Sequence, residues 1–177
     1  LLQYGVEEAL SAGVTNMAIV TGRGKRSIED HFDNAFELET QLKGTLKEHY
    51  LNEINIIIKK STFTYVRQQE MLGLGHAILT GEPLIGNVPF AVILADDLCV
   101  SHNYKNNVLT QMIKAYERYH CSIVAFQEVD PSETEKYGII SGELINGTDD
   151  LYQVNRMVEK PSPNESPGNM AIIGRYI

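Results

Sequence analysis

One apolar segment near the middle of the chain, Pro89–Asp97 (PFAVILADD), constrains the fold most. Its apolar run from Phe90 to Ala95 ends at two acids, a pattern typical of a strand buried on both faces in a parallel sheet. Ligands of open α/β sheets bind just beyond the carboxyl ends of such strands. Successive strand side chains point to opposite sides, so we expect one of Asp96 and Asp97 to face a ligand crevice.

A carboxylate in that position suits Mg²⁺, a hard cation that takes oxygen ligands and usually retains phosphates and waters. The structural alternative is that Asp96 and Asp97 only cap the turn that follows the strand. The segment by itself leaves both interpretations open.

Composition narrows the classes of protein. A chain of 177 residues with 43% hydrophobic residues forms one domain, or a large part of a larger protein. The net charge of −8 argues against a general nucleic-acid binder. We expect no membrane association, because there is neither an apolar run long enough to span a bilayer nor a signal peptide. Cys99 and Cys121 have neither metal-ligand nor redox spacing, which favours two reduced thiols in a cytoplasmic protein.

Helix-like and strand-like patterns alternate along the chain, which predicts βαβ units and a mainly parallel sheet. The predicted helices are 1–13, 27–32, a long stretch 34–58 that Gly44 interrupts, a helix from the Gly73–Gly75 turn to about Thr80, and 106–120. The predicted strands are 17–21, 62–66, 90–95, 121–126, 137–140, 154–159 and 169–176. Ser27 is the expected N-cap of its helix, with Asp30 in a capping-box position. Asn146–Gly147 predicts a hairpin in a more mixed second half.

Two glycine-rich turns follow predicted strands. The basic turn Gly22–Arg26 either holds a phosphate at a helix N-terminus or is simply a solvated surface turn. Gly73 and Gly75 either permit close backbone approach to a ligand or form a tight strand–helix turn. We assign His76 no catalytic role from the sequence.

Taken together, six strings resemble the bacterial UTP–glucose-1-phosphate uridylyltransferases among the sugar-nucleotide pyrophosphorylases: LLQYGVEEA, VRQ…GLGHAIL, FAVILADD, KYGII, MVEKP and NMAIIGRYI. The resemblance implies a Rossmann-like nucleotidyltransferase fold, with a mixed, mainly parallel sheet flanked by helices and a small β-hairpin region near the sugar site. It also implies a Mg²⁺ cofactor and a homo-oligomer, either a dimer or a tetramer. Residues 1–177 would be a single nucleotidyltransferase domain, without the family's N-terminal Gly-rich strand and loop and without its C-terminal segment.

The resemblance assigns a nucleotide side to the site. Gln68 corresponds to the residue that reads the uracil edge, since an amide can both accept and donate a hydrogen bond. Gly73 lies where the family brings backbone against the base, and Asp96 matches the Mg²⁺-binding, catalytic aspartate.

The resemblance also assigns a sugar side. Gly138 lies where backbone contacts glucose, and Glu159 matches the acid that hydrogen-bonds sugar hydroxyls. Lys160 matches the lysine at the sugar phosphate and is the second catalytic residue. Asn169 and Ile172 would line the same side.

The implied reaction joins UTP and glucose 1-phosphate into UDP-glucose and pyrophosphate. An enzyme alternative is the related thymidylyltransferase, whose members usually carry Gln where His76 stands, so GLGHA favours uridylyl transfer. A truncated, non-catalytic core that binds nucleotide-sugar is a second alternative. A glycosyltransferase is disfavoured because Asp96–Asp97 lacks the Asp-x-Asp spacing.

Overall fold

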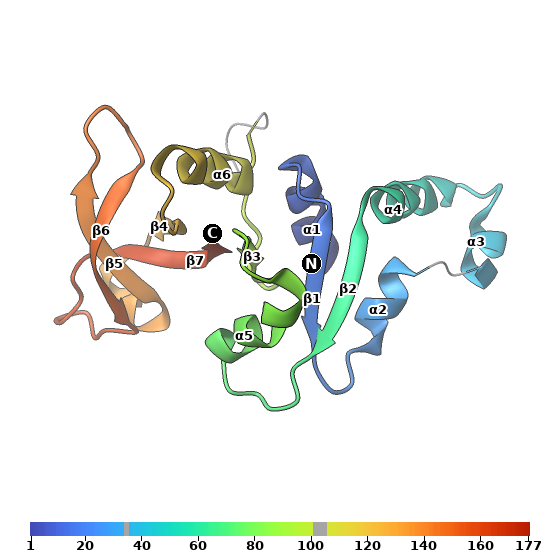
Figure 1. Cartoon of the computed structure of the whole chain (residues 1–177), viewed down its shortest axis with the longest axis horizontal. Helices are drawn as coiled ribbons and strands as arrows, with labels where there is room; N and C mark the ends of the chain where they lie inside the picture. Colours follow the sequence, from blue (N-terminus) through green and yellow to red (C-terminus); the bar gives the residue numbers. More distant parts are fainter. Residues whose placement is uncertain (34–35, 101–105) are drawn as a thin grey trace.

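The computed structural model describes residues 1–33, 36–100 and 106–177. Their elements are α1 (Leu2–Ser11), β1 (Asn16–Thr21), α2 (Arg26–Phe32), α3 (Phe36–Leu42), α4 (Glu48–Lys60), β2 (Thr62–Arg67), α5 (Leu74–Ile85), β3 (Val92–Ile93), α6 (Val108–Tyr119), β4 (Val124–Glu128), the 3₁₀ helix η1 (Pro131–Lys136), β5 (Gly138–Leu144), β6 (Tyr152–Glu159) and β7 (Met170–Tyr176). Figure 1 shows an elongated molecule with the β5–β6 hairpin at one end and α3 at the other. No helix in these ranges combines the length and the apolar character that crossing a membrane demands.

The first two strands form a parallel sheet. Asn16 at the start of β1 pairs with Thr62 at the start of β2, and Thr21 pairs with Arg67 at their carboxyl ends. A parallel pair requires a long crossover connection, which α2, α3 and α4 supply. The structure confirms both predicted strands and puts Gln68 directly after the carboxyl end of β2.

The remaining strands form an antiparallel sheet in the order β3-β7-β5-β6, with β4 also paired to β7. The strand predicted over 90–95 is wrong in length and direction, since β3 is only Val92–Ile93 and pairs antiparallel with Tyr176 and Arg175. The segment is also not buried on both faces, since Val92 and Ile93 are only half-buried and Phe90 is 40% exposed. The physical reason is that an apolar run specifies neither how fully its strand is covered nor the direction of the neighbouring strand. The α/β architecture is confirmed, although antiparallel pairing predominates in the described part of the chain.

The predicted hairpin at Asn146–Gly147 is confirmed. β5 and β6 pair from Leu144–Tyr152 beside the turn to Gly138–Glu159 at the open end. Gly147 has a φ of 81°, which glycine tolerates and hairpin turns require. This hairpin brings Gly138 and Glu159 opposite each other although they are far apart in sequence.

One part of the core lies between α1, α2, α4 and β2. Val6, Phe32 and Ile57 are buried together, and Phe63 of β2 stacks on Phe32 with ring centroids 4.6 Å apart. Stacked aromatic rings of this kind add to the free energy gained from burying their area. These contacts hold the crossover helices against the parallel sheet.

A second contact joins α1 to the antiparallel sheet. A methyl group built on Gly5 would lie 3.1 Å from Ile93 Cγ2, so α1 passes directly over β3. On α6, Asn107 caps the helix by accepting a hydrogen bond from the Thr110 amide, and its side-chain amide donates to the Glu8 carbonyl. Helix α1 is thereby fixed to both β3 and α6.

Two helix predictions need correction. Helix α2 begins at Arg26 and its N-cap is Lys25, so the predicted Ser27 cap with Asp30 is wrong. Gly24 has a φ of 80° and turns the chain immediately before this helix, which lets it begin earlier than the capping pattern suggests. The long stretch 34–58 is two helices, α3 and α4, and its first two residues lie outside the described ranges. Gly44, at a φ of 79°, lies between them, as predicted.

Candidate functional site

Gln68 is held at the carboxyl end of β2 by its backbone and its side chain. Its backbone amide continues the parallel ladder by donating to the Thr21 carbonyl at 2.9 Å. Its side-chain Nε2 donates to the Gly73 carbonyl at 3.3 Å and lies 2.9 Å from His76 Nδ1. The structure therefore brings Gln68 and Gly73 together, as the sequence predicts, and adds His76, to which the sequence assigned no role.

Gly73 precedes α5 and has a φ of 90°, a left-handed conformation that favours glycine. No atom outside its chain neighbours lies within 4 Å of a methyl group built on it. The requirement for glycine is thus conformational, and open space remains above the first turn of α5. A planar ring can approach the backbone closely there.

The two adjacent acids after β3 differ in their surroundings. Asp97 Oδ2 accepts a hydrogen bond from the Gly174 amide of β7 at 2.8 Å. Asp96 is exposed, and within the described ranges its carboxylate has no hydrogen-bond or ion-pair partner. Both side chains are exposed, but Asp97 is tied to β7 through one oxygen, whereas both Asp96 oxygens are without a partner among the described residues.

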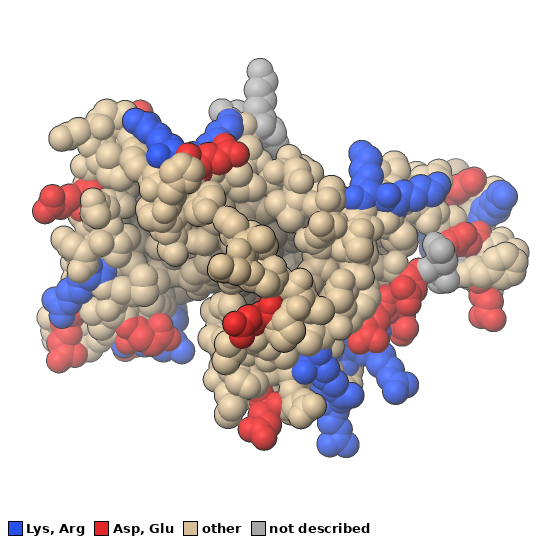
Figure 2. Space-filling view, in the orientation of Figure 1, with Lys and Arg blue, Asp and Glu red and all other residues tan. Residues whose placement is uncertain are grey.

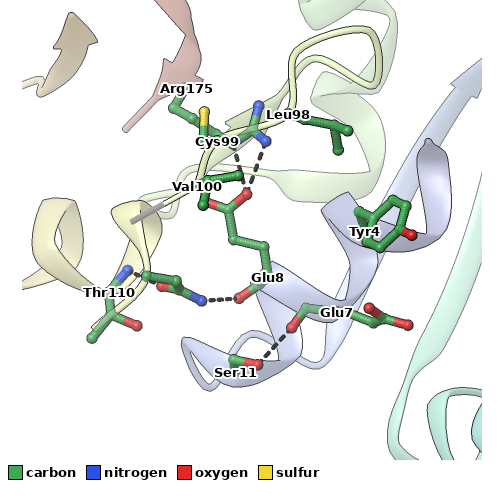
Figure 3. Close-up of a pocket in the computed structure, with 10 residues that line it drawn as sticks. Tyr4, Glu7, Glu8, Ser11, Leu98, Cys99, Val100, Thr110 and Arg175 are labelled. Carbon is green, nitrogen blue, oxygen red and sulfur yellow. Dashed lines mark hydrogen bonds and ion pairs between the residues drawn. The ribbon is translucent and has the colours of Figure 1, made fainter. Parts of the chain in front are cut away.

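The loop carrying these acids is anchored by a buried ion pair (Figure 3). Arg175 of β7 and Glu8 of α1 are 1% and 8% exposed, and their Nη2 and Oε2 atoms are 2.8 Å apart. The guanidinium makes five hydrogen bonds, two to Glu8 and one each to the carbonyls of Leu94, Gly174 and Asp97. Since an arginine has five N–H donors, none is left for a ligand.

Sequence reasoning missed this ion pair as a positioning element. The available signal was Arg175 inside the mostly apolar NMAIIGRYI, together with Glu8, one of two adjacent acids between Val6 and Ala9. A cavity of about 380 Å³ lies against the pair, lined also by Tyr4, Cys99 and Val100. It contains none of the predicted site residues, and the Arg175 guanidinium on its wall already uses all of its donors within the fold. Burial is the main cause that raises the pKa of the Cys99 thiol there.

The predicted sugar-side residues come together at the open end of the β5–β6 hairpin. A methyl group built on Gly138 would lie 3.2 Å from Glu159 Oε2 and 3.3 Å from Ile172 Cδ1. Gly138 thus leaves the space between an acid and an aliphatic side chain free. A carboxylate beside an apolar wall is a suitable arrangement for the hydroxyl edge and the C–H face of a sugar ring.

Lys160 follows directly and has a φ of 47°, which is uncommon for a residue that is not glycine. Its backbone amide donates to the Tyr137 carbonyl at 2.9 Å, which holds the turn in place. Its Nζ lies 3.8 Å from Glu159 Oε1, and both side chains are mostly exposed. Backbone strain of this kind is typical of functional sites.

Asn169 makes two hydrogen bonds with Val129 that the sequence did not predict. Its carbonyl accepts from the Val129 amide at 3.0 Å, and its Nδ2 donates to the Val129 carbonyl at 3.4 Å. Its side-chain oxygen has no partner within the described residues.

One face of β7 joins the acid loop to the sugar-side cluster. Ile172 contacts Gly138, and two residues further on Gly174 lies under Leu94 and Asp97. Two residues of a strand span about 7 Å, so the two groups are neighbours along β7. Tyr176 is next on this face, and burial, followed by the charges of Asp97 and Glu159, raises the pKa of its phenol.

Charges on the outer surface are unevenly distributed. Figure 2 shows Lys and Arg side chains gathered beneath the lower ends of β1 and β2, where the turn after β1 runs. This gathering lies at the carboxyl ends of the parallel strands, on a chain whose net charge is −8. Within the described ranges, no group of three or more His, Cys, Asp or Glu side chains could hold a metal ion.

The comparison with known families identifies the class of protein to which this α/β domain belongs. The family model described as "Nucleotidyl transferase" matches residues 1–177, and the chain belongs to that family.

A UTP–glucose-1-phosphate uridylyltransferase of Pseudomonas aeruginosa is 62% identical over 177 residues, which cover 100% of this chain and 62% of that protein. The crystal structure of an apo UDP-glucose pyrophosphorylase superposes with a TM-score of 0.92 at 57% identity, over 98% of this chain and 63% of that one. A UDP-glucose pyrophosphorylase complexed with UDP-glucose superposes with a TM-score of 0.88 at 55% identity, over 98% and 62% of the two chains. The chain thus spans about three-fifths of the length of the relatives it matches.

Proposed function

We propose that this chain forms the nucleotide- and sugar-binding core of a UTP–glucose-1-phosphate uridylyltransferase. The reaction joins UTP and glucose 1-phosphate into UDP-glucose and releases pyrophosphate. The observation that carries the proposal is that β7 contacts Gly138 through Ile172 and, two residues further on, Asp97 through Gly174, next to the exposed Asp96, in a chain that is 62% identical to such an enzyme. The neighbour with bound UDP-glucose supports the same assignment of a nucleotide-sugar ligand.

The main obstacle to this reaction is electrostatic, because nucleophile and target are both anionic phosphates. Two unit charges about 4 Å apart repel by about 1 kcal/mol in water and about 4 kcal/mol at an effective dielectric of 20. Lys160 supplies an exposed ammonium group whose carboxylate partner is at the edge of ion-pair distance, 3.8 Å. Its long side chain is free to bind the phosphate of the sugar substrate.

The Asp96 carboxylate fits Mg²⁺, which binds proteins through one or two carboxylates together with substrate phosphates and waters. A single exposed carboxylate is an open donor set of that kind. When bound there, the ion would neutralise phosphate charge. Asp97 and Arg175 hold the loop that presents Asp96, since each bonds to β7 or to the loop backbone.

The chain's other residues orient the substrates. Gln68 faces the base edge from the end of β2, and Gly73 lets the base lie against the backbone. Glu159 accepts hydrogen bonds from sugar hydroxyls in the space that Gly138 leaves open. No general base is needed because a sugar phosphate is ionised at neutral pH, so positioning and charge stabilisation carry the chemistry.

We further propose that the intact protein is a cytoplasmic homo-oligomer, a dimer or a tetramer. Two free cysteines are consistent with a reducing compartment. The segment that contains α3 and α4 exposes large apolar side chains, with Phe36 79% and Leu46 96% exposed. Light scattering of the intact protein tests the oligomeric state, and a monomer at micromolar concentration would reject it.

The deciding experiment measures pyrophosphate release by the intact protein from UTP and from dTTP, with glucose 1-phosphate, in Mg²⁺ and in excess chelator. Metal-dependent turnover that prefers UTP supports the proposal. A preference for dTTP would assign the chain to thymidylyl transfer instead, and no turnover with either nucleotide would reject both.

A matched pair of variants tests the sugar-phosphate site. Lys160→Met removes an exposed lysine that pairs with Glu159, and Lys136→Met removes another exposed lysine that pairs with Glu133. We expect only Lys160→Met to lower kcat/KM for glucose 1-phosphate, by about a hundredfold. Equal effects of the two variants would remove Lys160 from the site.

A further inference from the structure

The orientation of the Gln68 side-chain amide is determined by two acceptors on the first turn of α5. Nε2 carries two hydrogens, and it is placed against the Gly73 carbonyl and against His76 Nδ1. A carbonyl oxygen can only accept, so the amide group that faces Gly73 must be the NH₂ group. The alternative, flipped amide would place two oxygens against each other.

This orientation fixes the state of His76. If Nε2 donates to both partners, His76 Nδ1 must accept, and a neutral imidazole whose Nδ1 accepts carries its proton on Nε2. Both amide hydrogens are then used within the chain. The remaining group, Gln68 Oε1, is an acceptor without a partner among the described residues.

We propose that His76 is a specificity-determining residue, because it holds Gln68 so that only the amide oxygen is presented to the nucleotide base. The proposal rests on the proposed function and deepens it. A fixed acceptor binds a base that has a ring N–H on its edge, as uracil has at N3. Cytosine carries a lone pair at N3, so this ring atom opposes the same oxygen. His76 itself acts through Gln68 and is a positioning residue.

The inference corrects one expectation from the sequence, in which the Gln68 amide both accepts from and donates to the base. With both hydrogens committed to Gly73 and His76, the side chain reads the ring N–H alone. Thymine has the same ring N–H as uracil. The His76–Gln68 pair therefore separates UTP from CTP but does not separate UTP from dTTP.

The test compares kcat/KM for UTP, CTP and dTTP in the intact protein and in two variants. His76→Phe keeps a ring but removes the acceptor, and we expect the UTP/CTP ratio to fall by about ten- to a hundredfold. His76→Asn keeps an acceptor oxygen close to the position of Nδ1 and should retain most of the ratio. The UTP/dTTP ratio should stay the same in both variants and is the internal control.

A double variant shows whether His76 acts through Gln68. Gln68→Leu should lower the UTP/CTP ratio as His76→Phe does, and Gln68→Leu with His76→Phe should lower it no further than Gln68→Leu alone. Additive losses, an unchanged UTP/CTP ratio in His76→Phe, or an equal fall in the UTP/dTTP ratio would each overturn the inference. If His76→Phe does not fold, His76→Ala takes its place in the same scheme.

A separate readout distinguishes this inference from the proposed function. Long-range ¹H–¹⁵N NMR of the intact wild-type protein reports which imidazole nitrogen of His76 carries the proton. We expect an unprotonated Nδ1 at neutral pH, and a protonated Nδ1 would overturn the inference even if UTP is the preferred substrate. An unprotonated Nδ1 in a protein that does not turn over UTP would reject the proposed function while leaving the geometry of the pair intact.

Discussion

Removing the buried Arg175 side chain should destabilise the protein far more than removing an exposed ion pair. In Arg175→Met, Glu8, whose side chain is only 8% exposed in the wild type, loses its counter-ion, and the Asp97 carbonyl loses its guanidinium donor. Breaking a buried pair from one side costs about 3–5 kcal/mol. For a domain of this size, each kcal/mol lowers Tm by about 2–4 °C, so we expect Tm to fall by about 6–20 °C.

A double variant in which Glu8 is also neutral tests whether the unpaired charge of Glu8 causes the loss of stability. Glu8→Gln with Arg175→Met removes both charges, so the double variant should recover part of the stability that Arg175→Met loses, by about 1–3 kcal/mol. The surface pair of Lys136 and Glu133 has a shorter N–O distance, 2.6 Å, but is exposed on both sides. Glu133→Gln should therefore change the stability little, since burial and not distance decides the effect.

Urea denaturation of the intact protein, followed by far-UV circular dichroism, measures these differences. A loss below about 1 kcal/mol in Arg175→Met would contradict the structural role, because such a value is typical of surface pairs. A double variant less stable than Arg175→Met would show that Glu8 does not carry the uncompensated charge.

Three further outcomes follow from individual contacts. Asp96→Asn should abolish metal-dependent turnover without changing Tm, because the carboxylate has no partner in the described structure; a fall in Tm with activity retained would contradict this. Gly174→Ala should cost about 1–3 kcal/mol, since its methyl group would lie 2.6 Å from Leu94 Cβ, whereas Gly75→Ala, with open space around it, should be neutral or stabilising. Burial raises the pKa of the Cys99 thiol and so lowers its thiolate fraction at pH 8. Mass spectrometry should find the exposed Cys121 alkylated before Cys99.

Sequence patterns located most strand ends. A strand packed in a core is apolar, and polar residues follow it where the chain reaches the surface or a binding site. The ends of β2, before Gln68, and of β6, at Glu159, were located from this pattern, whereas the roles of Gln68, Glu159 and Lys160 came from the family resemblance. Strand direction was not accessible from the same pattern. An apolar run such as the one around Val92 has the same sequence pattern whether the neighbouring strand is parallel or antiparallel. Only its pairing with β7 shows that the direction is antiparallel.

Contacts between distant residues were also beyond the sequence. Adjacent aspartates look equivalent in a string, and their separation into a structural Asp97 and an available Asp96 depends on the Gly174 amide, which lies 77 residues away from Asp97. His76 likewise becomes informative only when Gln68 is seen to share its hydrogens between it and Gly73. In both cases a hydrogen bond within the fold decides which polar group is left to bind a ligand: one of two aspartates, or one atom of the Gln68 amide.

Strand β7 explains why the acid loop and the sugar-side cluster are held in one geometry. Ile172 and Gly174 face Gly138 and Asp97 on one side of the strand, and Arg175 reaches Glu8 of α1 from the other. Because successive side chains of a strand alternate, one short segment contacts the candidate site and anchors itself in the core at once. A change at Arg175 should therefore disturb the position of Asp96 as well as stability. The metal concentration needed for half-maximal turnover should rise in any Arg175 variant that still folds, and an unchanged value would separate the anchor from the site.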